Sequence, residues 1–550
     1  MDWTSMRHLA LAGTLVLYAG IPASALAAAE CAVEPIQAAA PKDTTIVSAD
    51  QLTEPVPHCK VEGYVTTTNP GPNQVNFRLQ LPEKDKWTKR FYFIGLGGTA
   101  GYVPTDSQIP AGNPLHKGFA VAGTDTGHQF GSVNWSFLGK NEAQTLDHVR
   151  RGAHVTTVAA QQITKAYYDA DKFYRYHSGC SGGGRMGQEA IINYPEDYDG
   201  VLLGEPGGGP GFGSETMLAF FHMAQQLNRE PGAFLTPAKL EMLDKKVTEH
   251  CDPLDGVKDG VVWEHEVCEY DFKQLLCQSG DGPECLTGPE LRTVEAIAAG
   301  PHDTRGKIKD GFPITNMSTW STFIGSVPPP WTANAGFMRP DQGLPRQSVG
   351  YTIGDTIARA FFNPDFDILT DFDFNNQEQV DHYWEMAKKL DYGDAFSTDL
   401  SGLQKAGGKV IFWSGVSAPC CLVQDLLKYY TTAAESVGGM RAFKEFASFY
   451  KVPAIGHCGG GTGPDDHADR LFEALVAWVE QGKTPGAIVS HRGSTASSVF
   501  ADPLKGTVAG VAVPSAVGDD RDFLLCPYPT IGKYNDNGGD VNDAANWTCK

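Results

Sequence analysis

The chain has 550 residues, of which 41% are hydrophobic and 10% aromatic, and 44 Lys and Arg stand against 65 Asp and Glu. This apolar content excludes an intrinsically disordered chain, and the 62 Gly and 35 Pro follow no collagen-like repeat. The net charge of −21 argues against nucleic acid or an anionic membrane as a partner, because phosphate contacts need clustered Lys and Arg.

The N-terminus has the pattern of an export signal. A short segment with Arg7 precedes the mostly apolar residues 9–23, and Ala25-Leu26-Ala27 is a small-residue cleavage pattern. We expect residues 1–27 to be removed, no membrane-spanning segment, and a mature protein that is secreted or periplasmic. All 12 cysteines lie beyond this cut, which predicts disulfides rather than a zinc site.

Short apolar runs alternate with helical segments along most of the chain, which predicts a parallel sheet with helices on its faces. The expected strands are 61–65, 75–79, 91–94, 119–123, 173–178, 200–204, 409–413 and 446–450. The expected helices are 142–170, 185–193 and 468–480. The pattern is interrupted between residues 206 and 400, and the tail after residue 495, rich in Gly and Asp, is expected to be irregular.

Two glycine-rich motifs carry candidate catalytic residues. Residues 179–183, Gly-Cys-Ser-Gly-Gly, form a G-x-S-x-G elbow between an expected strand and helix, and this context exposes Ser181 at the top of the sheet. His457, in Gly-His-Cys-Gly-Gly, occupies the late position of the base in α/β-hydrolases. If Cys180 pairs with Cys458, the two side chains lie close together. The alternatives are a chance glycine turn and an ordinary loop histidine.

These motifs resemble the tannase and feruloyl esterase family of α/β-hydrolases over about residues 45–495. That family joins a Cys-Ser pair to a His-Cys pair by a disulfide, and it includes an esterase that cleaves mono-(2-hydroxyethyl) terephthalate. The resemblance implies an α/β-hydrolase fold with a large inserted lid domain. It also implies a secreted serine esterase that acts on aromatic acid esters of the phenolic or terephthalate type.

The resemblance further implies the parts of the chain and the roles of its residues. The parts are a signal peptide (1–27), the first hydrolase segment (28–205), a lid insertion with a calcium loop (206–400), the second hydrolase segment (401–495) and a disulfide-stapled tail (496–550). Ser181 is the expected nucleophile and His457 the general base, with an oxyanion hole from the backbone N–H groups of Gly182 and Gly98. The implied disulfides are Cys31–Cys59, Cys180–Cys458, Cys251–Cys268, Cys277–Cys285 and Cys526–Cys549.

Residues 251–261 contain three carboxylates punctuated by glycines, a composition of hard oxygen ligands that suits Ca²⁺. From spacing alone a solvated acidic turn is the better interpretation, but the resembled family carries calcium on this pattern. The implied ligands are the carboxylates of Asp252, Asp255 and Asp259 and the backbone carbonyls of Val257 and Val261, and the implied role is structural.

The insertion contains aromatic and cationic residues that are candidates for an aromatic-acyl pocket, although core packing is the stronger explanation for most of the aromatics. These residues are Trp320, Phe323, Trp331, Phe337, Phe361, Phe362, Arg339, Arg346 and Arg359. The sequence does not discriminate among gallate, ferulate, chlorogenate and terephthalate monoesters, and it leaves the oligomeric state open.

The chain lacks the catalytic Asp of the resembled family at the expected position. Ala418 stands where the family has its catalytic Asp, and Asp425, seven residues on, is either a substitute or a surface charge, with surface charge favoured. This keeps open a second function, a catalytically weakened hydrolase fold that binds an aromatic ester or phenolic ligand. A carbohydrate- or surface-binding module has only the exported context in its favour. Cys420 and Cys421 remain as a vicinal disulfide or as two thiols.

Overall fold

The structure is a computed structural model that describes residues 30–104, 114–131, 133–206, 214–325, 348–390, 397–419, 421–493, 501–502, 507–508, 520–536 and 538–550. The expected signal peptide, residues 1–27, lies outside these residues. Within the described residues, no helix combines the length and the apolar character that crossing a membrane requires.

A nine-stranded sheet organises the chain, in the order β1-β2-β3-β5-β4-β6-β7-β10-β11. Its strands are β1 (Thr44–Leu52), β2 (His58–Thr67), β3 (Asn73–Pro82), β4 (Arg90–Gly95), β5 (Ala120–Thr124), β6 (Tyr174–Cys180), β7 (Gly200–Gly204), β10 (Lys409–Gly415) and β11 (Ala447–Val452). The first three are antiparallel, and neighbours run parallel from β5 to β11. The predicted α/β fold with a mostly parallel sheet is confirmed.

Helices cover both faces of the parallel part, which explains why its strands are apolar almost throughout. In β6 the hydroxyl of Tyr176 donates to Glu480 of one helix at 2.8 Å, while the ring of His177 bonds the carbonyl of Gly183 in another at 2.9 Å. Because successive strand residues point to opposite faces, these two helices lie on opposite sides of the sheet. The helices around the sheet are α1 (Val33–Ala39), α2 (Glu142–Leu146), α3 (Gly152–Tyr168), α4 (Gly182–Asn193), α12 (Val423–Ser436), α13 (Met440–Phe443) and α14 (His467–Gln481).

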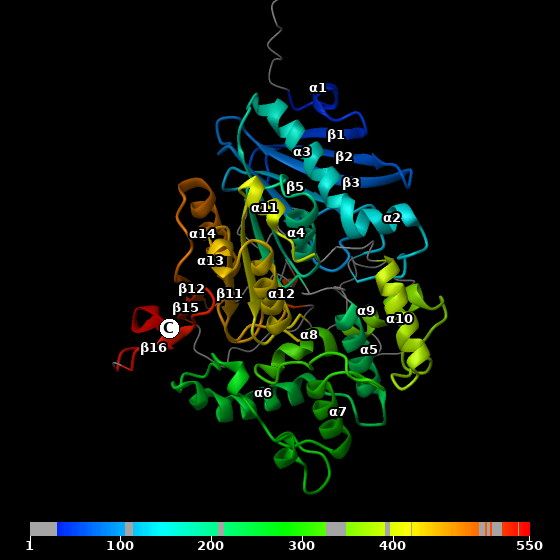
Figure 1. Cartoon of the computed structure of the whole chain (residues 1–550), viewed down its shortest axis with the longest axis vertical. Coiled ribbons are helices and arrows are strands. Elements are labelled where there is room, and N and C mark those ends of the chain that lie inside the picture. The colour runs from blue at the N-terminus through cyan, green and yellow to red at the C-terminus, as the bar shows by residue number, and fades with distance from the viewer. Residues whose placement is uncertain are drawn as a thin grey trace, which may run out of the picture.

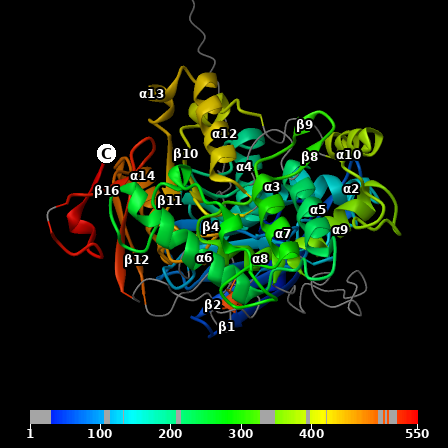
Figure 2. The same ribbon diagram turned by 90° about the horizontal axis from the view of Figure 1, so that it is seen from below.

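The chain leaves the sheet after β7 and returns at β10, its neighbour in the sheet. The segment up to residue 400, here called the lid, contains α5 (Ser214–Asn228), α6 (Pro237–Cys251), α7 (Gly288–Ala299), α8 (Ser321–Ile324), α9 (Val349–Phe361), α10 (Gln377–Leu390), β8 (His302–Asp303) and β9 (Gly306–Lys307). Helix α11 (Ser401–Ala406), just before β10, contacts α4 instead. Figure 1 shows most of the lid helices gathered at the end of the molecule opposite β1–β3, and Figure 2 views that end from below. Most residues of a second hydrophobic core belong to the lid, and Phe137, Leu138 and Val149 join it from the first hydrolase segment.

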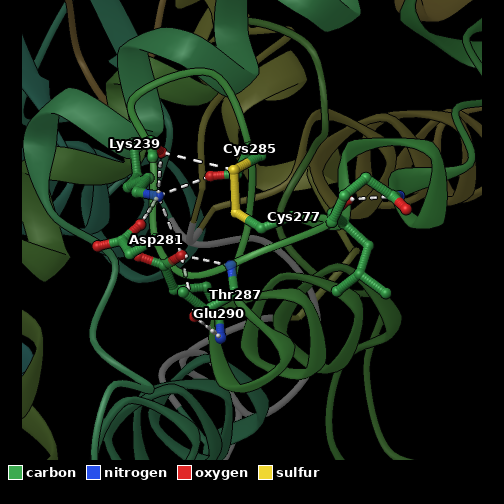
Figure 3. Close-up of a disulfide and its surroundings, with 9 residues drawn as sticks. Lys239, Cys277, Asp281, Cys285, Thr287 and Glu290 are labelled. Atoms are coloured by element: carbon green, nitrogen blue, oxygen red, sulfur yellow. Dashed lines mark hydrogen bonds and ion pairs between the residues drawn. A yellow bond between two sulfur atoms is a disulfide. The ribbon is translucent and has the colours of Figure 1, made fainter.

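A buried lysine fixes a small disulfide loop in the lid (Figure 3). The ammonium group of Lys239 donates to Asp281 at 2.7 Å and to the carbonyls of Gly282 and Cys285 at 2.8 and 2.6 Å. Its side chain is 8% exposed, and it also pairs with Glu290 at 3.2 Å. The lysine therefore holds the loop closed by Cys277–Cys285 against α6 and α7.

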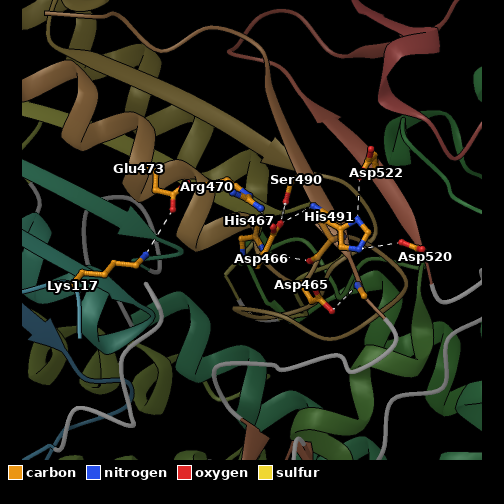
Figure 4. Close-up of polar contacts among 12 residues, drawn as sticks. Lys117, Asp465, Asp466, His467, Arg470, Glu473, Ser490, His491, Asp520 and Asp522 are labelled. Atoms are coloured by element: carbon orange, nitrogen blue, oxygen red, sulfur yellow. Dashed lines mark hydrogen bonds and ion pairs between the residues drawn. The ribbon is translucent and has the colours of Figure 1, made fainter. Parts of the chain in front are cut away.

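The tail was expected to be irregular, and this is wrong in part, because it contains short antiparallel pairs. Within the tail, β13 (Ala501–Asp502) pairs with β14 (Thr507–Val508), and β16 (Gly532–Tyr534) pairs with β17 (Trp547–Cys549), while β15 (Arg521–Leu525) pairs with β12 (Ile488–Arg492), which precedes the tail. At the start of α14, Asp466 accepts from the hydroxyl of Ser490 at 2.7 Å and from the N–H of His491 at 2.6 Å (Figure 4). Backbone pairing and these side-chain bonds order this part of the chain.

Five disulfides cross-link the described residues, and they are the five pairs that the resemblance implies: Cys31–Cys59, Cys180–Cys458, Cys251–Cys268, Cys277–Cys285 and Cys526–Cys549. Cys421 takes part in none of them, and Cys420 lies outside the described residues. The pairs differ most in the length of chain that they close, which is 278 residues for Cys180–Cys458 and 8 for Cys277–Cys285.

Removing these two disulfides is expected to have unequal effects on stability. In the chain-entropy model the long loop contributes roughly 5–6 kcal/mol and the short one roughly 2.5 kcal/mol. The double variant Cys180→Ala/Cys458→Ala should therefore lower the free energy of unfolding in urea more than Cys277→Ala/Cys285→Ala. Equal losses, or a larger loss for the short loop, would contradict this.

Candidate active site

Ser181 lies on a sharp turn between β6 and α4. Its backbone has φ 59° and ψ −121°, a left-handed conformation that is rare for a residue with a side chain, and its N–H donates to the carbonyl of Gly204 at 2.9 Å. A side chain at Gly179 would stand 2.6 Å from the backbone of Gly183, so the turn requires glycine there. This strained elbow is the geometry that exposes a nucleophilic serine.

The two residues expected to form the oxyanion hole lie against each other. A Cβ atom added to Gly182 would stand 2.0 Å from the carbonyl oxygen of Gly98 and 2.8 Å from its nitrogen. Only glycine at position 182 permits this approach. The loop after β4 is thereby brought to the first turn of α4, where helical N–H groups face developing negative charge.

A buried polar network supports that loop. The hydroxyl of Thr99 donates to the carbonyl of Gly131 at 2.6 Å, and the carbonyl of Thr99 accepts from Nε2 of His128 at 2.7 Å. Burial lowers the pKa of His128 to about 4, against the opposing effect of that hydrogen bond. His128 is therefore neutral at pH 7, and its role is to hold the backbone next to Gly98.

His457 follows β11 and is joined to the elbow by the disulfide between its neighbour Cys458 and Cys180, with the two Cα atoms 6.0 Å apart. Its side chain is 5% exposed. The ring of Phe323, from helix α8 of the lid, lies 5.5 Å from the imidazole ring, measured between ring centres. The elbow of Ser181, His457 and the lid thus meet at the carboxyl ends of the parallel strands, where α/β proteins bind their ligands.

The sequence analysis missed the carboxylate that bonds His457. Oε2 of Glu205 lies 2.6 Å from Nδ1 of His457, and the Glu205 side chain is completely buried. The carboxylate also accepts from the N–H of Gly415 at 2.7 Å and from that of Cys458 at 2.9 Å. One oxygen of Glu205 and the sulfur atoms of the Cys180–Cys458 disulfide lie within 4.8 Å of one another.

Glu205 directly follows β7, and its backbone has a positive φ of 40°. A carboxylate immediately after a buried parallel strand was the signal that could have revealed it, because the carboxyl ends of the strands share one edge of the sheet.

The two positions that the sequence analysis considered for the catalytic acid lie elsewhere. Ala418 is buried in the loop after β10, and Asp425 pairs with Lys309 of the lid. Asp425 is therefore a paired carboxylate at the lid interface, and His457 receives its carboxylate from Glu205.

Charged neighbours change the basicity of His457. Burial lowers the pKa of its imidazole, but contacts with Cys421 and Glu205 raise it, and the outcome is a pKa of about 10. These acidic partners favour the protonated imidazole, whereas burial favours the neutral one.

The proposed pocket residues divide into three groups. Phe323 reaches the site, as described above. Trp320, Phe361 and Phe362 pack on lid aromatics (Phe312, Tyr383 and Phe366, respectively), and Arg359 pairs with Asp355, so core packing explains these four. The third group, Trp331, Phe337, Arg339 and Arg346, lies outside the described residues.

The expected calcium loop is a turn in which each carboxylate binds backbone N–H groups. Asp252 accepts from the N–H groups of Asp259 and Gly260, both at 3.0 Å. Asp255 accepts from the N–H of Trp263 at 2.7 Å. Within this fully described loop, the three aspartates do not bring one oxygen each within 4.8 Å of one another.

The C-terminal tail supplies a cation to this loop. Arg521 pairs with the carboxylate of Asp259, its guanidinium donates to the Asp259 carbonyl at 3.0 Å, and both side chains are completely buried. The indole of Trp263 also stacks against Trp547, with ring centres 4.4 Å apart. Three buried carboxylates with one guanidinium leave two negative charges, and a divalent cation with oxygen ligands would balance them.

Comparison with known proteins identifies relatives over most of the chain. The family model described as tannase and feruloyl esterase matches residues 59–550. Feruloyl esterase C of Talaromyces stipitatus is 27% identical over 514 residues, covering 89% of this chain and 85% of the relative. Mono(2-hydroxyethyl) terephthalate hydrolase of Piscinibacter sakaiensis is 26% identical over 566 residues, covering 94% and 88%.

Solved structures share the fold. Feruloyl esterase B from Aspergillus oryzae superposes with a TM-score of 0.72 at 21% identity, covering 94% of this chain and 100% of the other. Tannin acyl hydrolase from Aspergillus niger superposes with a TM-score of 0.69 at 18% identity, covering 95% and 96%. At these identities the likeness establishes the architecture, and the chemistry rests on the residues described above.

Proposed function

The chain belongs to the tannase and feruloyl esterase family of carboxylic ester hydrolases, and we propose that it cleaves aromatic acid esters through an acyl-enzyme on Ser181. The observation that carries the proposal is the buried bond between Glu205 and His457, tied by a disulfide to a serine elbow. These groups supply the nucleophile, base and orienting carboxylate that acyl transfer requires.

In this mechanism, His457 in its neutral form takes the proton of Ser181 as the hydroxyl attacks the ester carbonyl. The N–H groups of Gly182 and Gly98 donate to the oxyanion, and each such donor is worth a few kcal/mol in the transition state. The carboxylate of Glu205 keeps a proton on Nδ1 and stabilises the imidazolium. His457 then protonates the departing alcohol and activates the water that releases the acid.

The proposed substrates carry an aromatic acyl group. The lid places the Phe323 ring beside His457, where it can contact such a group. The names of the relatives point the same way, since they act on feruloyl, tannin and mono(2-hydroxyethyl) terephthalate esters. The alternative of a weakened, ligand-binding hydrolase depended on the missing acid at Ala418, and Glu205 removes that reason.

The reaction is tested with p-nitrophenyl acetate and a panel of methyl ferulate, methyl gallate and mono(2-hydroxyethyl) terephthalate. Ser181→Ala should lose at least about a thousandfold in kcat on every ester that the parent cleaves, because the nucleophile is gone. Ser436→Ala, which removes an exposed serine from α12, is the matched control and should keep the parent rate. Ester cleavage that survives in Ser181→Ala would refute the proposal.

The role of Glu205 is tested by amide substitution. Glu205→Gln retains the shape but removes the charge that stabilises the imidazolium, and in the serine-protease template the equivalent change costs about 10⁴ in kcat. We expect a loss of about 10³–10⁴ in kcat, whereas Asp425→Asn should change kcat less than about twofold. In the Glu205→Gln background, Ala418→Asp should restore part of the rate. An unchanged kcat in Glu205→Gln would assign the acid elsewhere.

We also propose that the loop of residues 252–261 binds one structural Ca²⁺. Asp252, Asp255 and Asp259 would supply carboxylates and Val257 and Val261 backbone carbonyls, once the side chains draw together around the ion. The support is the charge balance with Arg521 and the burial of the three carboxylates.

Removing calcium should therefore lower stability without altering the chemistry. A chelator is expected to lower the melting temperature by several degrees while kcat at 25 °C stays unchanged. Asp255→Asn, which removes a ligand charge, should abolish the effect of the chelator. A melting temperature that does not respond to chelator, together with no calcium by mass spectrometry, would contradict the proposal.

Export is part of the proposed function. Residues 1–27 have the pattern of a signal peptide, and five disulfides suit an oxidising compartment. We propose that the mature enzyme works in the periplasm or outside the cell, on ester substrates that reach it there.

A further inference from the structure

The loop that follows β4 carries Gly98, the second proposed oxyanion donor, on a strained backbone. Its φ angles are 59° at Gly98, 57° at Ala100 and 75° at Gly101, all in the left-handed region. That region is rare for a residue with a side chain, such as Ala100. A backbone of this kind keeps its shape only where the surrounding structure constrains it, so the position of the Gly98 N–H depends on the neighbours of this loop.

Two side chains from the loop after β5 constrain the backbone directly next to Gly98. The carbonyl of Thr99 accepts from Nε2 of His128 at 2.7 Å and from the hydroxyl of Thr126 at 3.3 Å. Nε2 of His128 carries the proton, because Nδ1 of the same ring accepts from the N–H of Phe130 at 3.3 Å. The peptide group that follows the proposed donor is therefore held by two side-chain hydrogen bonds.

Thr126 adopts a conformation that its own side chain disfavours. Its φ is 58°, a genuine outlier for a β-branched residue, and the residue is buried. The hydroxyl of Thr124 accepts from its N–H at 3.1 Å and helps to maintain the turn. Strained residues cluster at active sites, where the strain is part of the mechanism. Here the strained backbone brings the hydroxyl of Thr126 to the carbonyl of Thr99.

A π-helical turn lies behind Thr126. Residues Asp147–Arg151 form it between α2 and α3, and such turns are rare and frequently occur at functional sites. Nδ1 of the buried His148 in this turn lies 3.2 Å from the hydroxyl of Thr126. The single proton of that hydroxyl is used in the bond to Thr99, so Nδ1 of His148 is the donor. The turn thereby fixes the direction in which the hydroxyl of Thr126 points.

The same turn is bonded to the helix that carries the first proposed donor. The guanidinium of Arg185, in helix α4, donates to the carbonyl of Val149 at 2.6 Å, and Arg185 is buried. Helix α4 begins at Gly182. The π-helical turn is therefore connected to Gly182 through Arg185 and to the loop of Gly98 through Thr126, and the mechanism derived above uses none of these contacts.

We propose that Thr126 and His148 are positioning residues that hold the two oxyanion donors at the separation that the tetrahedral intermediate requires. A donor stabilises the oxyanion only from within hydrogen-bonding distance of the place where the negative charge develops. Without the hydroxyl of Thr126, the strained loop relaxes and the N–H of Gly98 moves away from that place. The inference rests on the proposed oxyanion hole of Gly182 and Gly98.

The kinetic test compares kcat and KM for three substitutions in this network. Thr126→Val keeps the β-branched shape but lacks the hydroxyl, and His148→Phe keeps a ring but lacks the donor. Each should lower kcat about ten- to a hundredfold with KM changed less than about twofold, because the lost contact acts in the transition state. Thr126→Ser restores the hydroxyl and should keep kcat within about threefold of the parent.

Thr164→Val is the matched control. It removes a buried hydroxyl from α3 whose partner is the carbonyl of Ala160 in the same helix, at 2.7 Å, and it should keep the parent kcat. If Thr126→Val does not fold, His148→Phe provides the same test.

A second measurement separates this inference from the proposed function. Hydrogen–deuterium exchange of peptides that cover residues 96–101 needs no turnover and can be followed in the Ser181→Ala background. Added to that background, Thr126→Val should speed exchange in this loop, and Thr164→Val should not. Faster exchange together with a lower kcat at unchanged KM supports the inference.

Several results would overturn the inference. They are exchange that Thr126→Val leaves unchanged, a parent-like kcat in Thr126→Val and His148→Phe, a loss that appears in KM instead, and a loss that Thr126→Ser does not recover. Ester cleavage that survives in Ser181→Ala would refute the esterase mechanism instead.

Discussion

The disulfide between Cys180 and Cys458 connects the end of β6 with the loop after β11, across two intervening strands of the sheet. Ser181 directly follows Cys180, and His457 directly precedes Cys458. The separation of Ser181 and His457 therefore depends on a covalent bond rather than on packing alone. Glu205 lies against the same sulfur atoms and accepts from the N–H of Cys458. One cross-link thus fixes the proposed nucleophile, the proposed base and the carboxylate as a unit.

The position of the carboxylate follows from the sheet. Strands β7 and β10 are parallel neighbours, with Gly204 opposite Trp413, so both end at the same edge beside His457. An acid can therefore approach the imidazole from either strand. In this chain the family position after β10 is Ala418, and the acid after β7 is Glu205, whose additional methylene group extends its reach compared with Asp. The positive φ of Glu205 and its two backbone donors show how closely the surrounding structure constrains it.

The sequence was sufficient for the parts of the site that lie within local motifs. Ser181 stands in a strand–turn–helix signature, and His457 is flanked by glycines and a cysteine, so both were predicted and lie together in the structure. Glu205 has no such signature, because its role depends on a neighbouring strand that lies about 200 residues further along the chain. The tail shows a related limit, since β15 pairs with β12 across a stretch rich in Gly and Asp, and its sequence does not reveal that partner.

The tail also explains how the lid is held in place over the site. Arg521 on β15 reaches the loop at the end of α6 and pairs with Asp259, and Lys533 pairs with Glu264 on the same side. A guanidinium is buried favourably only beside a carboxylate. The pairing of Arg521 with Asp259 is therefore more specific than an apolar contact at the same place would be. Farther along the lid, Asn316 accepts from the hydroxyl of Thr462 at 3.0 Å and the Phe323 ring lies beside His457. The last strands of the chain thereby anchor one part of the insertion, while a later part of it places the Phe323 ring beside His457.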